Sequence, residues 1–66
     1  SMAKTDCKNY ISEKFEIPRS AVHVSGGCVH SGQVVIPVRI DSRHPRIEEK
    51  GKCSLIDGDV SYRGSY

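Results

Sequence analysis

The chain carries its clearest strand signal at residues 34–41, VVIPVRID. Every even-numbered position from 34 to 40 holds a β-branched aliphatic residue, and a period of two places those side chains on one face of a strand. Pro37 has no N–H group to donate to a neighbouring strand, so we expect this strand to lie at the edge of its sheet or to contain a bulge. An exposed edge could pair with another chain, although Pro37 and Arg39 are also typical of protection against such pairing.

A polar stretch follows at residues 42–51, SRHPRIEEKG. It is long for a connection in a small protein, where hairpin loops usually take about 2–5 residues. Pro45 would stiffen such a loop and lower the entropy that is lost when it becomes ordered. The stretch therefore predicts a long, mixed-charge loop, and loops of this kind are common locations for functional residues.

A hairpin is predicted after this loop, because Asp57-Gly58 is a strong two-residue turn signal. The turn joins predicted strands at residues 53–56 and 59–63. Side chains alternate along both strands, so the turn also fixes the expected register. In that register the facing pairs are Leu55 with Val60 and Cys53 with Tyr62.

A β-branched segment at residues 21–29 precedes the central signal and is interrupted by Gly26-Gly27. Two glycines inside a strand predict a bulge or a close approach by another backbone or a ligand. They do not form a phosphate-binding fingerprint, because the G-x-G-x-x-G and P-loop patterns are absent and no helix follows. Residues 30–33, HSGQ, predict the turn that leads into the strand at 34–41.

One helix is predicted, at residues 5–16, where apolar side chains recur at helical spacing and the other face is polar. Thr5 or Asp6 can cap its start by accepting hydrogen bonds from free backbone N–H groups, and Pro18 ends it. The apolar stripe consists of Cys7, Tyr10, Ile11 and Phe15. The order of elements predicts an α+β fold, α-β-β-β-β, with an N-terminal helix packed on a small antiparallel four-stranded sheet.

The length of 66 residues and the hydrophobic content of 36% predict one small domain, residues 1–66, with a thin core. A homodimer would supplement such a core, as oligomerisation often does in small proteins. Ser1 before Met2 is typical of a cloning scar, so we expect a gene product of about this length. Residues 64–66 have no evident anchor and are expected to form a flexible tail.

Composition favours the cytoplasm. No apolar run approaches the ~18 residues of a membrane span, and no signal-peptide pattern precedes the first charged residues, so no membrane partner is expected. The odd number of cysteines, three, fits a compartment where thiols stay reduced. The formal net charge of +2 permits a nucleic-acid partner without demanding one.

Basic residues concentrate between positions 39 and 52 and recur near the C-terminus. Arginine forks can hold phosphate oxygens, while Arg and Tyr are also favoured anchors at protein interfaces. Glu48 and Glu49 offset part of the positive charge, which favours shape-specific recognition over non-specific phosphate binding. The candidate binding residues are Arg39, Arg43, His44, Arg46, Lys50, Lys52, Arg63 and Tyr66.

The sequence offers residue types for a metal or catalytic site, but not their usual spacing. Cys28 and His30 would share one face of a strand, and other cysteines and histidines could complete a zinc site, yet the C-x₂₋₄-C and H-x₃₋₅-H pairs are absent. A Cys–His nucleophile has no distinguishing spacing, and so short a chain has little volume for a pocket of the usual ~300 Å³. We therefore expect no enzyme, no cofactor and no metal.

Three functional hypotheses follow from these observations. The first is a small non-enzymatic binding protein that acts on a macromolecular partner through the loop at 42–51. Such a protein would resemble a phage- or mobile-element-type inhibitor or adaptor of host nucleic-acid or defence machinery. The second is direct nucleic-acid binding through the face that carries Arg39, Arg43 and Arg46. The third is a small-ligand binder at a dimer interface.

Overall fold

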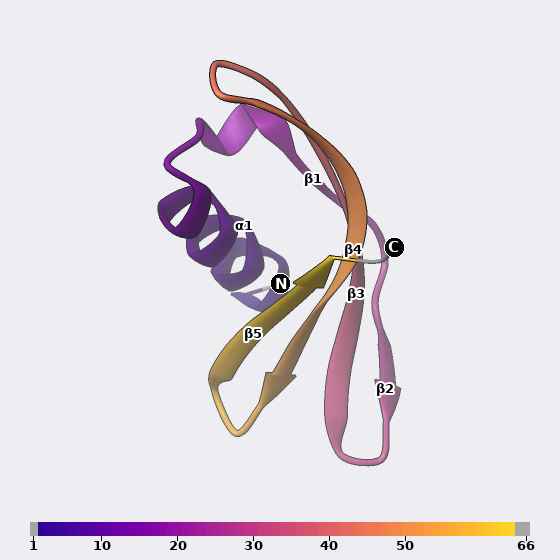
Figure 1. Ribbon diagram of the computed structural model, residues 1–66. Helices are drawn as coiled ribbons and strands as arrows, with labels where there is room; N and C mark the ends of the chain where they lie inside the picture. Colours follow the sequence, from indigo (N-terminus) through magenta and orange to yellow (C-terminus); the bar gives the residue numbers. More distant parts are fainter. Residues whose placement is uncertain (1, 65–66) are drawn as a thin grey trace.

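Within residues 2–64, which the computed structural model describes, one α-helix lies across one face of an antiparallel sheet (Figure 1). This arrangement confirms the predicted α+β fold, with five strands because residues 22–30 form two short ones. The described residues include no helix with the length and apolar character that crossing a membrane requires. The elements are α1 (Met2–Phe15), the 3-10 helix η1 (Arg19–Ala21), β1 (Val22–Val24), β2 (Cys28–His30), β3 (Gln33–Arg43), β4 (Arg46–Ile56) and β5 (Asp59–Gly64).

Helix α1 begins at Met2, earlier than predicted, so Thr5 and Asp6 lie inside the helix and do not cap it. Ala and Lys are good helix formers, and Ala3 packs against the core, which accounts for the extra residues. The predicted apolar stripe is confirmed as the buried face of the helix. Its members are the fully buried Cys7 and Ile11 and the partly buried Tyr10 and Phe15.

The C-terminal end of α1 is a Schellman-type cap. Glu16 adopts a left-handed conformation, with φ of 54°, and the Ile17 N–H donates to the Ser12 carbonyl at 3.0 Å. The Ser12 hydroxyl donates in turn to the Ile17 carbonyl at 2.6 Å. Pro18 follows, as predicted for the residue that ends the helix, and this cap turns the chain back toward the sheet.

Strand β3 lies in the middle of the sheet, so the predicted edge position is wrong. β4 pairs along one side of β3, and β1 and β2 share the other side. Pro37 falls between the end of β1 at Val24 and the start of β2 at Cys28, so its missing N–H coincides with a gap in pairing. Its carbonyl still accepts the Ser25 N–H at 3.1 Å. Residues 34–40 therefore offer no free edge to another chain.

The glycine pair lies in the same gap and divides the strand predicted at 21–29. A Cβ atom at Gly27 would lie 2.8 Å from Cγ1 of Ile36 and 2.9 Å from the carbonyl oxygen of Val35. The predicted close approach is therefore confirmed at Gly27. A Cβ atom at Gly26 would have no neighbour within 4 Å.

The loop predicted at 42–51 is instead the end of a long hairpin. β3 continues to Arg43 and β4 starts at Arg46, so only His44 and Pro45, joined by a cis peptide bond, form the turn. Buried and exposed side chains keep alternating through the polar segment. The prediction is wrong because charged side chains suit the solvent face of a strand as well as a loop, and a cis proline fits a four-residue turn.

The hairpin between β4 and β5 has the predicted turn and register. Asp57 and Gly58 both have positive φ, 50° and 83°, which suits the twist of a two-residue hairpin turn. The turn between β2 and β3 is of the same kind, with positive φ at Ser31 and Gly32. The confirmed facing pairs are Leu55 with Val60 and Cys53 with Tyr62.

The core lies between α1 and the face of the sheet that the helix covers. At its centre Cys7 and Cys53, which are 46 positions apart in sequence, form a disulfide with Cα atoms 6.1 Å apart. The expectation of three reduced thiols is therefore wrong, and only the exposed Cys28 is free. The buried core residues are Cys7, Ile11, Ile17, Ala21, Val22, Ile36, Val38, Ile40 and Cys53.

Tyr62 lies at the side of this core and links β5 to β4 and α1. Its ring meets that of Phe15 edge to face, with centroids 5.8 Å apart. Its hydroxyl donates to the Glu49 carboxylate at 2.6 Å. Burial raises the pKa of Tyr62 well above the ordinary value of a tyrosine, and the hydrogen bond and negative charge of Glu49 raise it further.

The raised pKa of Tyr62 predicts an alkaline loss of stability. The folded protein keeps a proton that the unfolded chain releases above about pH 10, so this contribution is complete below that pH and declines as the pH rises further. A Tyr62→Phe variant should lose about 0.5–1.5 kcal/mol of unfolding free energy at neutral pH. Between about pH 10 and 11 its unfolding free energy should then fall less than that of the parent. Urea unfolding at both pH values measures this, with Tyr10→Phe as the control. An alkaline decline equal to that of the parent would contradict the prediction.

Candidate functional site

Positive charge gathers on the face of the sheet that α1 leaves uncovered. Odd-numbered residues of β3 and even-numbered residues of β4 point away from the helix, and those nearest the hairpin turn are exposed. The chain has ten Lys and Arg and eight Asp and Glu residues. Among the described residues, six of the cations lie on this face against three carboxylates, by the register of the strands. The cations are Arg39, Arg43, Arg46, Lys50, Lys52 and Arg63, and the carboxylates are Asp41, Glu48 and Asp59.

Like charges stand directly opposite each other across the strands of this face. Such pairs destabilise a sheet, because facing side chains lie only about 4.5–5.5 Å apart at Cβ. Natural sequences tolerate local conflicts of this kind mainly at functional sites. The like-charge pairs are Arg43 with Arg46, Asp41 with Glu48, Arg39 with Lys50, and Lys52 with Arg63.

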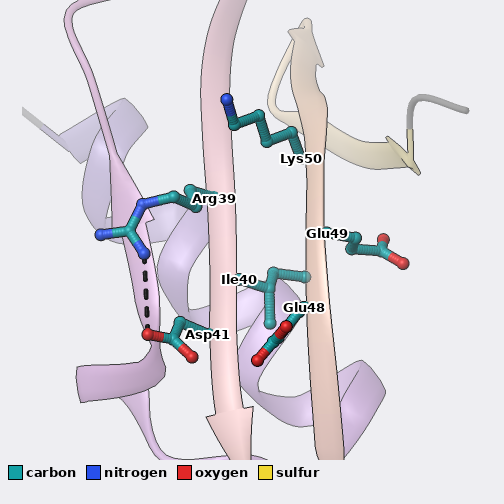
Figure 2. Close-up of a pocket in the computed structure, with 6 residues that line it drawn as sticks. All are labelled: Arg39, Ile40, Asp41, Glu48, Glu49 and Lys50. Carbon is teal, nitrogen blue, oxygen red and sulfur yellow. Dashed lines mark ion pairs between the residues drawn. The ribbon is translucent and has the colours of Figure 1, made fainter.

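Two ion pairs run along the strands and offset part of this repulsion. The Arg39 guanidinium lies 3.7 Å from the Asp41 carboxylate, and the Arg46 guanidinium lies 3.0 Å from Glu48. Figure 2 shows the first pair, with Arg39 and Asp41 both extending from β3. All four side chains are more than half exposed, and such surface pairs contribute about 0–1 kcal/mol. A charged ligand could therefore displace them at small cost.

The acidic pair Asp41–Glu48 divides the predicted Arg39, Arg43 and Arg46 face into two parts. Arg43 and Arg46 stand beyond the acidic pair, at the turn of the β3–β4 hairpin. Arg39 stands on the other side, opposite Lys50. The three arginines therefore do not form one continuous surface.

The larger of the two parts is a basic track, made of Arg39, Lys50, Lys52 and Arg63. It crosses β3, β4 and β5, whose neighbouring strands lie about 4.8 Å apart, and it steps along β4 by about 6.8 Å. Within residues 2–64, neither Lys52 nor Arg63 has an ion pair. The track thus presents four cations to solvent, two of them without a carboxylate partner in the described part of the chain.

Two hollows flank the start of the track and share Arg39 and Lys50 as lining residues. One, of about 320 Å³, opens toward the acidic pair, and Figure 2 shows Arg39 and Lys50 above Asp41 and Glu48 around it. The other, of about 350 Å³, opens toward β1. Its lining residues are His23, Ser25, Pro37, Val38, Arg39 and Lys50.

The remaining predicted binding residues lie away from the track or outside the described residues. His44 and Arg43 line a hollow of about 280 Å³ beside η1, at the tip of the hairpin. Tyr66 lies outside the described residues. His23 and Ser25 were not among the predicted binding residues, because their place beside Arg39 depends on the pairing of β1 with β3, which no local sequence signal specifies.

The structure also bears on the metal and catalytic alternatives. Cys7 and Cys53 are joined to each other, which removes both from any zinc site or nucleophile set. Cys28 and His30 alternate with Val29 on β2, so they share one face of the strand as their spacing predicts, and both are exposed. In the described ranges, no three His, Cys, Asp or Glu side chains are grouped so that they could hold a metal ion.

Comparisons with protein-family models, curated proteins and solved structures find no match for this chain. The charge and geometry of the uncovered face are therefore the basis on which a function can be argued. Its distinguishing features are the like-charge pairs, the basic track and the cation-lined hollow beside β1.

Proposed function

We propose that this protein is a non-enzymatic binding module that docks nucleic acid on its uncovered sheet face through the basic track. The observation that supports this most directly is the placement of Arg39 opposite Lys50 and of Lys52 opposite Arg63. These repulsive pairs would be relieved by a ligand that brings closely spaced negative charges. A nucleic-acid backbone brings one phosphate charge per nucleotide. Neutralisation of these charges by Lys and Arg dominates the affinity of proteins for nucleic acid.

The composition of the face favours phosphates over bases and over a protein surface. No aromatic side chain of residues 2–64 lies on this face, so the stacking by which single-stranded bases are held is not provided there. Lysine is depleted at protein–protein interfaces, whereas lysine and arginine are the usual phosphate contacts. The track is half lysine, so it suits a sequence-independent contact with the backbone.

The hypothesis of a protein-directed inhibitor has less support here than nucleic-acid binding. It assigned recognition to a loop at 42–51, and those residues are two strand ends and a tight turn. Arg46 at the turn is also paired with Glu48. Retention of an acidic protein partner is accordingly one outcome of the binding test.

A charge-reversal variant of the track tests the proposal. We expect Lys52→Glu/Arg63→Glu to weaken binding to a duplex of about 20 base pairs by about 30-fold at about 50 mM salt. The log–log slope of affinity against salt should become shallower by about 2, because two phosphate contacts are lost. Fluorescence anisotropy of a labelled duplex at several salt concentrations measures both quantities.

A matched control separates the track from net charge. Lys4→Glu/Lys8→Glu makes the same charge change on α1, on the other side of the molecule, and should change affinity by no more than about threefold. Equal weakening by the two double variants would show that only net charge matters, against the proposal. A different result would be a parent protein that binds no nucleic acid and retains an acidic protein in the presence of nuclease. That result would replace nucleic-acid binding with the hypothesis of a protein-directed inhibitor.

A further inference from the structure

The hollow beside β1 differs from its neighbour in the groups that line it. Pro37 and Val38 of β3 line it, together with His23 of β1 and with Ser25, which follows the end of β1. His23 stands opposite Arg39 in the register of β1 with β3, and Arg39 stands opposite Lys50. One cross-strand row thus supplies an imidazole, a guanidinium and an ammonium group to the same hollow of about 350 Å³.

Ser25 completes a set of hydrogen-bond donors in this hollow. Its backbone N–H is fixed on the Pro37 carbonyl at 3.1 Å, which holds the residue at the rim. Its hydroxyl can donate, as can an imidazole nitrogen of His23 in either protonation state. Among the residues that the structure describes, no Asp or Glu lines this hollow, whereas Asp41 and Glu48 both line the hollow of about 320 Å³ on the other side of the same row.

We infer that this hollow is a phosphate subsite, and that it prefers a terminal phosphate monoester to the diesters of a nucleic-acid backbone. The inference rests on the proposed function, since it takes the phosphate to belong to a strand lying on the basic track. A monoester carries a charge of about −1.5 to −2 at pH 7, with three acceptor oxygens, while a backbone diester carries a single charge. Two cations and two further hydrogen-bond donors around one opening match the monoester better.

The ion pair between Arg39 and Asp41 does not close the subsite. Their charged groups are 3.7 Å apart and more than half exposed, so the pair is weak in water. A phosphate offers the guanidinium a bidentate contact, which is stronger than a single loose ion pair. Arg39 can therefore turn from Asp41 toward the hollow that it already lines.

Two duplexes of about 20 base pairs, which differ only in a 5′-phosphate on one strand, test the subsite. Titrated into the full isotope-labelled chain at about 50 mM salt, the phosphorylated duplex should bind about fivefold more tightly. Inorganic phosphate, compared with chloride at equal ionic strength, should shift the NMR signals of His23, Ser25 and Arg39 most. A His23→Ala/Ser25→Ala variant keeps all four residues of the track, so it should bind the unphosphorylated duplex as the parent does and lose the fivefold preference. Cys28→Ala/His30→Ala, on β2 outside the hollow, should keep the preference.

Each outcome separates the subsite from the proposed function. Equal binding of the two duplexes by the parent would overturn the subsite and leave the track in place. Binding of neither duplex, with signals of the hollow shifted by inorganic phosphate, would support the subsite and overturn the nucleic-acid function. No binding and no shift would overturn both. Loss of the preference in both alanine variants would also overturn the assignment to His23 and Ser25.

Discussion

A Cys7→Ala/Cys53→Ala variant is expected to melt roughly 20–30 °C below the parent protein. The disulfide joins residues 46 positions apart, and a cross-link over a loop of that length removes about 4 kcal/mol of chain entropy from the unfolded state. A domain of this size has little stability beyond that amount. Thermal unfolding followed by circular dichroism, without reductant, measures the change.

Cys28 provides the control for this variant. It is exposed and unbonded, so Cys28→Ala should change the melting temperature by no more than about 3 °C. A thiol reagent added to the folded parent should modify one cysteine per chain, because both bonded cysteines are fully buried. A double variant that melts within a few degrees of the parent would show that the cross-link adds no stability.

Gly51→Ala is expected to destabilise the protein by about 2–3 kcal/mol. Gly51 is buried in β4, and a Cβ atom there would lie 2.5 Å from the Arg63 carbonyl oxygen and 2.5 Å from the Tyr62 hydroxyl oxygen. Backbone and a packed ring would both have to move, and the hydrogen bond from Tyr62 to Glu49 would be strained or lost. Urea unfolding of the variant and the parent measures the difference in free energy.

Gly26→Ala is the matched substitution for Gly51→Ala. It adds the same methyl group where nothing lies within 4 Å of the new Cβ atom. The unfolding free energy should therefore fall by no more than about 0.5 kcal/mol, or rise slightly. If the two alanine variants had equal stability, close packing between β4 and β5 would not be the reason that Gly51 is a glycine.

Local signals in the sequence predicted most of the fold. The stripe that includes Cys7 and Ile11 placed the helix and its buried face, and Asp57-Gly58 fixed both the turn and the register of its hairpin. These features depend on neighbours in sequence. The disulfide does not: the sequence placed Cys7 on the apolar stripe of the helix and Cys53 opposite Tyr62, but their meeting depends on how α1 lies across the sheet.

The site was predictable only in part for the same reason. Alternation along residues 34–40 already placed Arg39 on the face opposite the aliphatic residues. Its position opposite Lys50 follows from a turn at His44-Pro45, and the charged segment around that turn reads equally well as a loop. A shift of the turn by one residue would send every side chain of β4 to the other face.

The cross-link at Cys53 has a consequence for ligand capture. Cys53 is the residue next to Lys52, and it ties β4, which carries half of the basic track, to α1 through the core. The backbone under the track is therefore already ordered before a ligand arrives. Binding then restricts mainly the rotamers of lysine and arginine side chains, at about 0.5–1.5 kcal/mol for each one held. In the proposed binding of nucleic acid, the uncovered face is a preorganised surface whose affinity is limited by side-chain entropy and salt.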